Sequence, residues 1–151
     1  MKEQQHETYF IKELNEQDFD SLTGFEETLT NLSNVNLCSK IKLKELLNKI
    51  NSQNGHIYVA IEDETIIGCA TLLIEQKIIH DAGKVAHIED VSTNKNHCKK
   101  GVGSNLIKKI VQDAKIAGCY KIILDCKDDL KIFYEKQGFK HHENCMRLDL
   151  I

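Results

Sequence analysis

The sequence predicts an α/β domain with a mixed, twisted sheet and helices on both faces. Three observations support this prediction. The chain has 151 residues, a length that suits one domain with a real core. Strand-like and helix-like patterns alternate in the order β-α-α-β-β-β-α-β-α-β. A strand also runs through a basic, glycine-bearing turn directly into an amphipathic helix. We expect one domain over residues 1–151, without repeats or linkers.

The first third of the chain predicts one strand and two helices. Residues 8–12 alternate in polarity, which is typical of a short strand. Asn15 or Asp18 is expected to cap a helix that reaches about Leu32. Apolar residues recur at helical spacing over residues 39–50 and predict a second helix there.

Three strands are predicted next. Residues 56–62 and 65–77 are strand-like, and the two-residue connection at 63–64 predicts that they form a hairpin. A turn at 81–83 then leads into a fourth strand over residues 84–93.

The last third predicts two helices and two strands. Residues 101–117 show the clearest amphipathic helix, and Gly118 suits its C-terminal cap. Residues 120–126 are apolar without alternation, as in a strand buried on both faces. A short helix over 129–137 and a final strand over 139–150 complete the sheet.

Composition excludes several classes of function. The formal net charge of -3 gives no overall positive field for nucleic acid. No apolar run approaches the roughly 20 residues of a membrane span, and the first residues are polar, so we expect a cytoplasmic protein. No Cys-x-x-Cys pair occurs among six cysteines, so neither a metal site nor disulfides are expected. Cys69, Cys119 and Cys126 are expected to be small core residues.

The turn at 98–103 is a candidate phosphate site. A strand that feeds through this turn into a helix leaves backbone N–H groups unpaired at the positive end of the helix dipole. Gly101 and Gly103 allow a phosphate to approach the backbone closely, and Lys99 and Lys100 add positive charge. The alternative is a basic surface turn that only caps the helix.

Several blocks in the right order resemble a known family. The acidic fourth strand, the glycine turn and residues 133–139 resemble the Gcn5-related N-acetyltransferases (GNAT). Residues 74–80, 87–91 and 118–126 are similar, within that superfamily, to the glucosamine 6-phosphate N-acetyltransferases. The chain departs from the usual pattern at three positions that bear on binding of coenzyme A (CoA), namely Cys98, Lys99 and Leu130.

The resemblance implies a GNAT (acyl-CoA N-acyltransferase) fold and a reaction. The acetyl group of acetyl-CoA would pass directly, in a ternary complex, to the 2-amine of glucosamine 6-phosphate. The product, N-acetylglucosamine 6-phosphate, would feed UDP-N-acetylglucosamine synthesis. The family is also typically a homodimer with the last strand at the interface. No nucleic acid, membrane or metal is implied.

Three residues receive chemical roles from this resemblance. Tyr134 is the candidate general acid for the CoA thiolate, because a phenol with a pKa near 10 is protonated at neutral pH. The backbone N–H near Val91 would meet the thioester carbonyl. A backbone carbonyl near Asp125, or a water, would take the amine proton. The implied CoA ligands are Val91, Ser92, Thr93, Lys99, Lys100, Gly101, Val102, Gly103, Ser104, Asp125, Tyr134 and Lys136.

The implied sugar-phosphate ligands combine carboxylates with positive side chains. Glu89 and Asp90 would position the sugar rather than act as bases, because a nearby carboxylate raises the pKa of the amine and opposes its deprotonation. The phosphate needs cationic or N–H donors. The expected set is Thr30, Lys77, Ile78, Ile79, His80, Glu89, Asp90, Val91, Tyr120, Lys121 and Arg147.

Two alternatives stay open at this point. A GNAT enzyme of this size could acetylate another amine, such as a polyamine, a peptide N-terminus or a lysine. The chain could also be a CoA-binding module without catalytic activity. Cationic side chains around the acceptor favour the sugar phosphate over a peptide.

Overall fold

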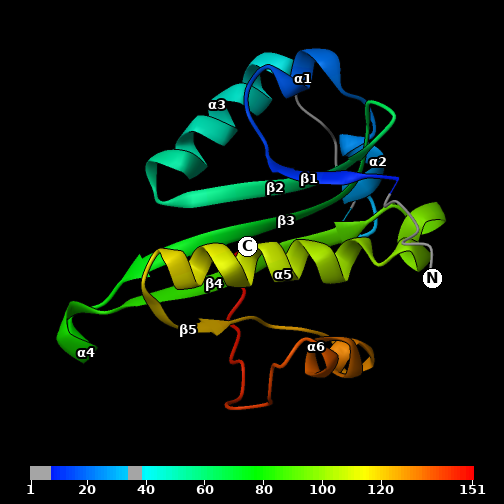
Figure 1. Ribbon diagram of the computed structural model, residues 1–151. Helices are drawn as coiled ribbons and strands as arrows, with labels where there is room; N and C mark the ends of the chain where they lie inside the picture. The colour runs from blue at the N-terminus through cyan, green and yellow to red at the C-terminus, as the bar shows by residue number, and fades with distance from the viewer. Residues whose placement is uncertain (1–7, 34–38) are drawn as a thin grey trace, which may run out of the picture.

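The structure is a computed structural model that describes residues 8–33 and 39–151, apart from the side chains of residues 98–100. Its centre is a five-stranded sheet in the order β1-β2-β3-β4-β5, with helices against both faces (Figure 1). The predicted mixed sheet between helices is therefore confirmed.

The first four strands are antiparallel neighbours, and the fifth is parallel to the fourth. The connection between β2 and β3 has positive φ at both Asp63 (47°) and Glu64 (60°), the conformation that two-residue hairpins prefer. The predicted hairpin is thus confirmed. The strands are β1 Phe10–Glu13, β2 Gly55–Glu62, β3 Thr65–Gln76, β4 Lys84–Thr93 and β5 Cys119–Ile123.

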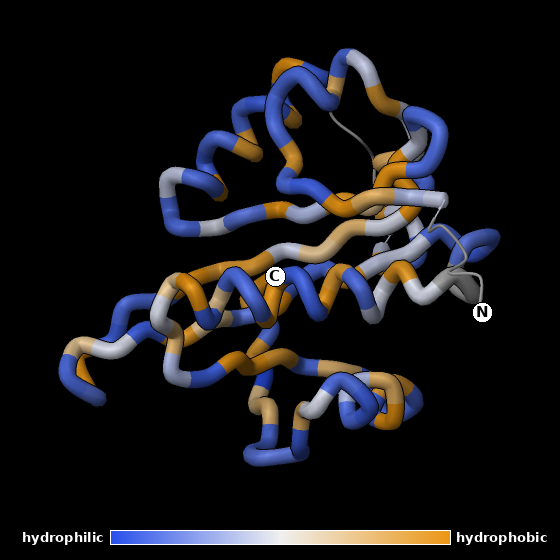
Figure 2. Tube along the Cα trace, in the orientation of Figure 1, coloured by the Kyte–Doolittle hydropathy of each residue, from blue (hydrophilic) through white to orange (hydrophobic). Residues whose placement is uncertain are grey.

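Helix α5 (Val102–Ile116) covers one face of the sheet. Its apolar residues, including Leu106 and Ile110, are fully buried in a core that also contains Ala86 and Ile88 of β4. Figure 2 shows hydrophobic and hydrophilic residues alternating along this helix. The burial of one stripe explains why the amphipathic pattern predicted the element well.

The opposite face is covered by α1 (Asp18–Ser21), α2 (Phe25–Leu29) and α3 (Lys40–Ser52). A second core joins Phe19 and Leu47 of these helices to strand residues. None of the helices in the described ranges is long and apolar enough to cross a bilayer.

The single helix expected up to Leu32 is wrong, because the chain forms α1 and α2 instead. Between them, the Thr23 N–H donates to the Glu64 carbonyl at 3.1 Å, and the Ile66 N–H donates to the Thr23 carbonyl at 2.8 Å. Gly24 then turns the chain at a φ of 84°. Pairing with a distant strand therefore overrides the local helical preference.

The predicted final strand over 139–150 is also wrong. The described residues beyond α6 (Lys131–Lys136) form no strand, and Met146 and Leu148 are 89% and 83% exposed. Consequently β5 is an edge strand, with Tyr120 and Ile123 exposed, and not a strand buried on both faces as expected. A strand needs a hydrogen-bonded neighbour, and residues 139–150 do not pair with the open edge of β5 or with any other described strand.

Candidate active site

Strand β4 contains a bulge at the acidic motif. Asp90 has a φ of 50°, and its strand presents Asp90 and Val91 opposite a single β3 residue, Ala70. The pairing of β4 with β5 ends at His87 of β4 and Ile123 of β5. The second half of β4 therefore leaves β5, and the backbone around Val91 lies where the two strands separate.

The turn that follows β4 leads directly into α5, as the sequence predicts. Residues Lys95–Lys100 form a 3-10 helix, and Gly101 then adopts a φ of 71° at the start of α5. A Cβ on Gly103 would lie 3.4 Å from Cζ of Phe133, so α6 faces this first turn closely. The helix N-terminus fits a phosphate group. The side chains of the predicted ligands Lys99 and Lys100 lie outside the described part of the structure.

The end of β4 is tied to α2 by side chains. The buried Ser92 hydroxyl donates to the Thr28 carbonyl, and Asn31 Nδ2 donates to the Thr93 carbonyl at 2.5 Å. Thr30 is exposed beside these contacts, and its hydroxyl donates to a carbonyl of its own helix at 2.7 Å. The Ser92 side chain is thus buried and uses its one donor for the Thr28 carbonyl. No sequence signal identified Asn31.

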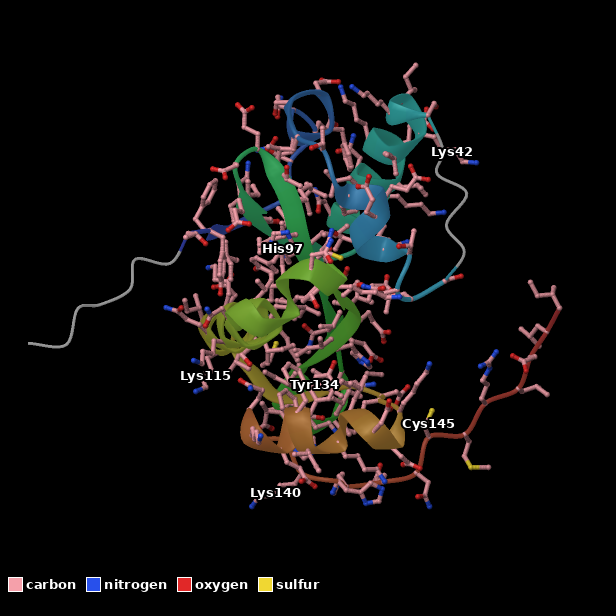
Figure 3. The ribbon with its side chains drawn as sticks, turned by 90° about the vertical axis from the view of Figure 1, so that its right-hand side faces the viewer. Lys42, His97, Lys115, Tyr134, Lys140 and Cys145 are labelled. Atoms are coloured by element: carbon pink, nitrogen blue, oxygen red, sulfur yellow. The ribbon has the colours of Figure 1, made fainter. Side chains whose placement is uncertain are left out.

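Tyr134 lies on the side of α6 that faces α5 (Figure 3) and is only 7% exposed. Its ring packs edge-on against Phe133 and Phe139, with centroids 4.9 and 6.0 Å away. Burial raises the pKa of the Tyr134 phenol, and Cys126 adds to the rise. The group is therefore protonated at neutral pH, as a general acid must be.

Helix α6 is also fastened to the first turn of α5. Gln137 Nε2 donates to the Ser104 hydroxyl at 3.0 Å. This contact brings the helix of Tyr134 to the predicted cofactor turn. Lys136, the last residue of α6, is exposed.

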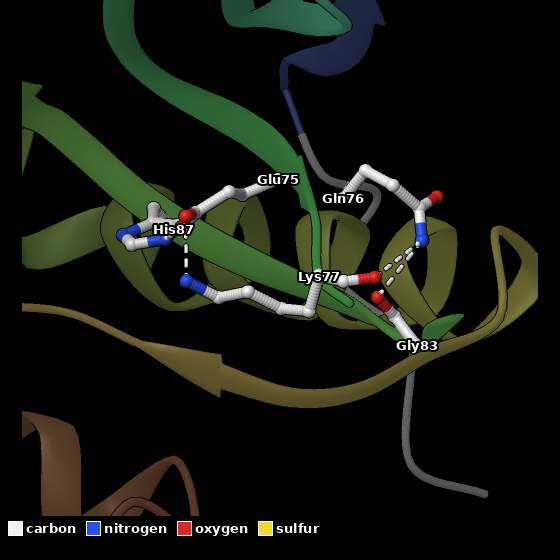
Figure 4. A network of polar contacts seen from close by, with 5 residues as sticks. All are labelled: Glu75, Gln76, Lys77, Gly83 and His87. Carbon is white, nitrogen blue, oxygen red and sulfur yellow. Dashed lines mark hydrogen bonds and ion pairs between the residues drawn. The ribbon is translucent and has the colours of Figure 1, made fainter. Parts of the chain in front are cut away.

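A polar network occupies the sheet face opposite α5 (Figure 4). Lys77 Nζ lies 2.5 Å from one Glu75 oxygen, and His87 Nε2 lies 2.7 Å from the other. Hydrogen bonds from Lys77 and then His87 lower the pKa of the Glu75 carboxyl. Strand register puts Glu75, His87 and Glu89 on one face. Sequence reasoning assigned no role to Glu75 or His87.

The electrostatics around Glu89 differ from those at Glu75. Burial raises the pKa of the Glu89 carboxyl, and the negative charges of Asp90 and Asp125 add to the rise, while His87 opposes it. Three carboxylates therefore influence one another where β4 and β5 separate. Such a region attracts a cationic or hydrogen-bonding ligand.

The turn between β3 and β4 brings four of the predicted substrate ligands together. The His80 ring lies 4.5 Å from the Tyr120 ring, and Lys121 Nζ lies 5.8 Å from the same ring. Lys77 starts this turn, whose tip includes the short α4 (Ile79–Ala82). The predicted ligands Ile78 and Ile79 are 97% and 63% exposed.

Arg147 is not joined to this group in the structure. It lies in the tail that leads away from the body beyond Cys145 (Figure 3), and its guanidinium pairs with Asp149 at 2.6 Å. Asp125 is exposed and accepts a hydrogen bond from the Cys145 thiol at 3.4 Å. Within residues 8–33 and 39–151, no cluster of three or more metal-ligating side chains is found.

Comparisons with known proteins agree on one family. Residues 6–139 match the Acetyltransferase (GNAT) family. The glucosamine 6-phosphate N-acetyltransferase of Candida albicans is 37% identical over 135 residues, which cover 87% of this chain and 89% of the relative. The enzyme of the same name from Arabidopsis thaliana is 32% identical over 139 residues, covering 89% and 92%.

A solved structure supports the same conclusion. The crystal structure of glucosamine-6-phosphate N-acetyltransferase from Arabidopsis thaliana superimposes with a TM-score of 0.89 and 30% identity. The match covers 96% of this chain and all of that chain (100%). GNAT acetyltransferases use acetyl-CoA as the acetyl donor. The separated strands, the glycine turn and these matches agree: the chain belongs to the GNAT acetyltransferase family, among the glucosamine 6-phosphate N-acetyltransferases.

Proposed function

We propose that this protein transfers the acetyl group of acetyl-CoA to the 2-amine of glucosamine 6-phosphate, directly and within a ternary complex. One observation carries the proposal: a cationic and aromatic cluster lies at the end of the sheet where β4 and β5 begin. That cluster consists of Lys77, His80, Tyr120 and Lys121. Relatives at 32–37% identity over most of the chain bear the corresponding name.

The cofactor half of the site uses backbone groups. N–H groups from residue 99 to residue 104 bind the pyrophosphate of CoA at the positive end of α5. Gly101 and Gly103 have no side chains to hinder that approach. The bulge at Asp90 turns the backbone N–H of Val91 toward the thioester carbonyl, where it stabilises the oxyanion that develops on attack.

Proton movements complete the reaction. The amine nitrogen forms a bond to the acetyl carbonyl carbon, and the carbon–sulfur bond then breaks. Tyr134 donates its phenolic proton to the departing thiolate. Glu89 and Asp90 position the amino sugar, and the amine proton passes to a backbone carbonyl near Asp125 or to water.

The acceptor half binds the phosphate dianion with Lys77, His80 and Lys121. Lys77 already contacts Glu75, so the phosphate shares that ammonium with a carboxylate. Thr30 lies beside the far end of the ten-residue β4, so it joins these groups only where a second copy of the chain brings the two ends together. A peptide or polyamine acceptor would gain nothing from three cationic or donor groups around an anion site.

The family also indicates the oligomeric state of the protein, its location and the use of its product. The protein acts as a homodimer, in which the exposed tail of one copy reaches the exposed edge of β5 in the other and supplies Arg147 to the site. Cys69, Cys119, Cys126 and Cys145 are free thiols, which supports a reducing, cytoplasmic location. The product serves UDP-N-acetylglucosamine synthesis.

The test is a panel of amines with release of the CoA thiol as readout. Glucosamine 6-phosphate should be turned over well above glucosamine, spermidine and a lysine peptide. Turnover of spermidine or the peptide instead would assign a different acceptor, and CoA binding without thiol release would make the protein a binding module. Lys121→Ala should raise KM for the sugar phosphate about tenfold through the loss of one charged contact, whereas the control Lys115→Ala should leave it unchanged.

A further inference from the structure

We propose that Gln76 is a positioning residue for the sugar-phosphate site, because its amide fixes the turn that carries Lys77 and His80. The inference rests on the proposed function and adds a residue that does not itself face the substrate. Gln76 is the last residue of β3 and follows Glu75 directly. Neighbouring strand residues point to opposite faces, so the two side chains act on different parts of the site.

The amide of Gln76 reaches three carbonyls of one turn. Its Nε2 donates to the carbonyls of Lys77, Ala82 and Gly83 at 3.0, 2.5 and 3.2 Å (Figure 4 shows two of these contacts). A single amide thus joins the beginning of the turn to its end. Two backbone bonds assist, from Lys77 N–H to the Gly83 carbonyl at 2.8 Å and from Gly83 N–H to the Ile79 carbonyl at 3.1 Å.

The turn needs such support because its backbone is unfavourable. His80, Asp81 and Ala82 all have left-handed conformations, with φ of 55°, 54° and 56°. None of them is Gly, and Ala in particular gains no local hydrogen bond from its side chain. Three consecutive left-handed residues persist only where the surrounding contacts hold them.

Little else covers the outer side of the turn. Ile78 is 97% exposed and Ile79 is 63% exposed. The inner side rests on Tyr120, where a Cβ added to Gly83 would lie 2.8 Å from Cδ1 of that ring. The same ring stacks with His80 at 4.5 Å. The Gln76 amide and the Tyr120 ring therefore set together where His80 and Lys77 stand.

This arrangement predicts a specific kinetic effect. Gln76→Leu keeps nearly the same size but removes the donors, so the turn relaxes and the phosphate ligands move apart. KM for glucosamine 6-phosphate should rise about tenfold, while KM for acetyl-CoA and the melting temperature change little. Gln76→Glu, which sets a carboxylate against three carbonyls, should raise KM further, and Gln76→Arg, which restores donors, should rescue it.

The measurement is steady-state kinetics with both substrates varied, beside thermal unfolding of each variant. Gln112→Leu, an exposed glutamine of α5, is the matched control and should behave as wild type. Gly83→Ala is a second route, because its Cβ would push the turn off Tyr120 and should give the same selective rise in KM.

The outcomes separate two failures. A wild-type protein that does not turn over glucosamine 6-phosphate contradicts the proposed function. Two results with an active wild type would overturn the positioning role of Gln76. In one, the Gln76→Leu variant keeps the wild-type KM for glucosamine 6-phosphate. In the other, its KM values for both substrates rise while its melting temperature falls. A selective rise in KM that Gln76→Arg reverses supports it.

Discussion

At the scale of single residues, three positions have conformations or surroundings that the proposed chemistry needs. Asp90 and Gly101 have positive φ, one in the β4 bulge and one at the start of α5. Tyr134 is buried in an aromatic cluster that raises its pKa. The motifs led to all three residues, but the left-handed conformation of Asp90 belongs to a bulge that forms only against β3, so no local signal predicts it.

Tyr134→Phe tests the general acid. The ring should keep its packing, so the melting temperature and KM for acetyl-CoA should change little. Turnover should fall about a hundredfold, because the thiolate then leaves without a proton donor. Steady-state release of the CoA thiol measures the turnover. A variant with weakened acetyl-CoA binding but normal kcat would assign Tyr134 to binding instead.

Gly101→Ala tests the cofactor turn, with Gly118→Ala as its matched control. Both glycines have positive φ, 71° and 79°, and a Cβ on either would meet no atom within 4 Å. Each substitution should therefore cost about 1 kcal/mol of stability through backbone strain alone. Only Gly101→Ala should also raise KM for acetyl-CoA. If the two variants had the same KM for acetyl-CoA, the result would argue against phosphate binding at this turn.

At the scale of elements, a polar contact joins strand to helix inside an otherwise apolar interface. The Tyr58 hydroxyl of β2 donates to Asp113 of α5 at 2.5 Å, and Lys109 donates to the other Asp113 oxygen at 2.8 Å. Burial acts to raise the pKa of Asp113, but the hydrogen bonds from Lys109 and Tyr58 outweigh it, so the pKa is lowered overall. Burial and the bond to Asp113 raise the pKa of Tyr58.

This contact makes stability depend on pH. Because the pKa of Asp113 is lower in the folded protein, its contribution is complete above the unfolded value of 3.8 and is lost as the pH falls through the folded pKa. Asp113→Asn should cost about 1 kcal/mol at pH 7. Urea unfolding at pH 7 and pH 3 should show the difference between wild type and variant shrinking at pH 3. A difference independent of pH would mean that the carboxylate charge is irrelevant.

At the scale of the whole molecule, β5 leaves an open edge on the sheet. Exposed β5 has no partner strand on its outer side among the described residues, and the tail beyond α6 carries exposed apolar side chains in alternation. These exposed apolar residues of the tail are Met146, Leu148 and Leu150. Pairing of a strand from a second copy would bury both surfaces and supply the strand that the alternating pattern predicts.

The homodimer is tested by molar mass in solution. Light scattering after size exclusion should give about twice the 17.3 kDa of one chain. The double variant Met146→Asp, Leu148→Asp should shift the protein toward one chain, because charges would replace the buried apolar side chains. Ile41→Asp, an exposed residue of α3, is the control and should stay dimeric. A monomeric wild type would contradict the proposal.

Local pattern alone predicted most of the elements. The limits of β4 are as expected, and α5 and the β2–β3 hairpin differ by about one residue, because alternation, a 3.6-residue period and turn chemistry are local properties. The GNAT motifs also led to the residues of the candidate site. The sequence by itself therefore determined the fold class, the position of the glycine turn before α5 and the family.

Only the tertiary structure decided how these parts meet. It divided the first predicted helix at Gly24, placed the bulge at Asp90, and left residues 139–150 without a strand partner. It also revealed the contacts of Glu75 and Gln76 around the turn between β3 and β4. Most of these features depend on hydrogen bonds or packing between residues far apart in the chain, and the Gln76 contacts cross a turn to residues six and seven positions away. Periodicity carries no information about such partners.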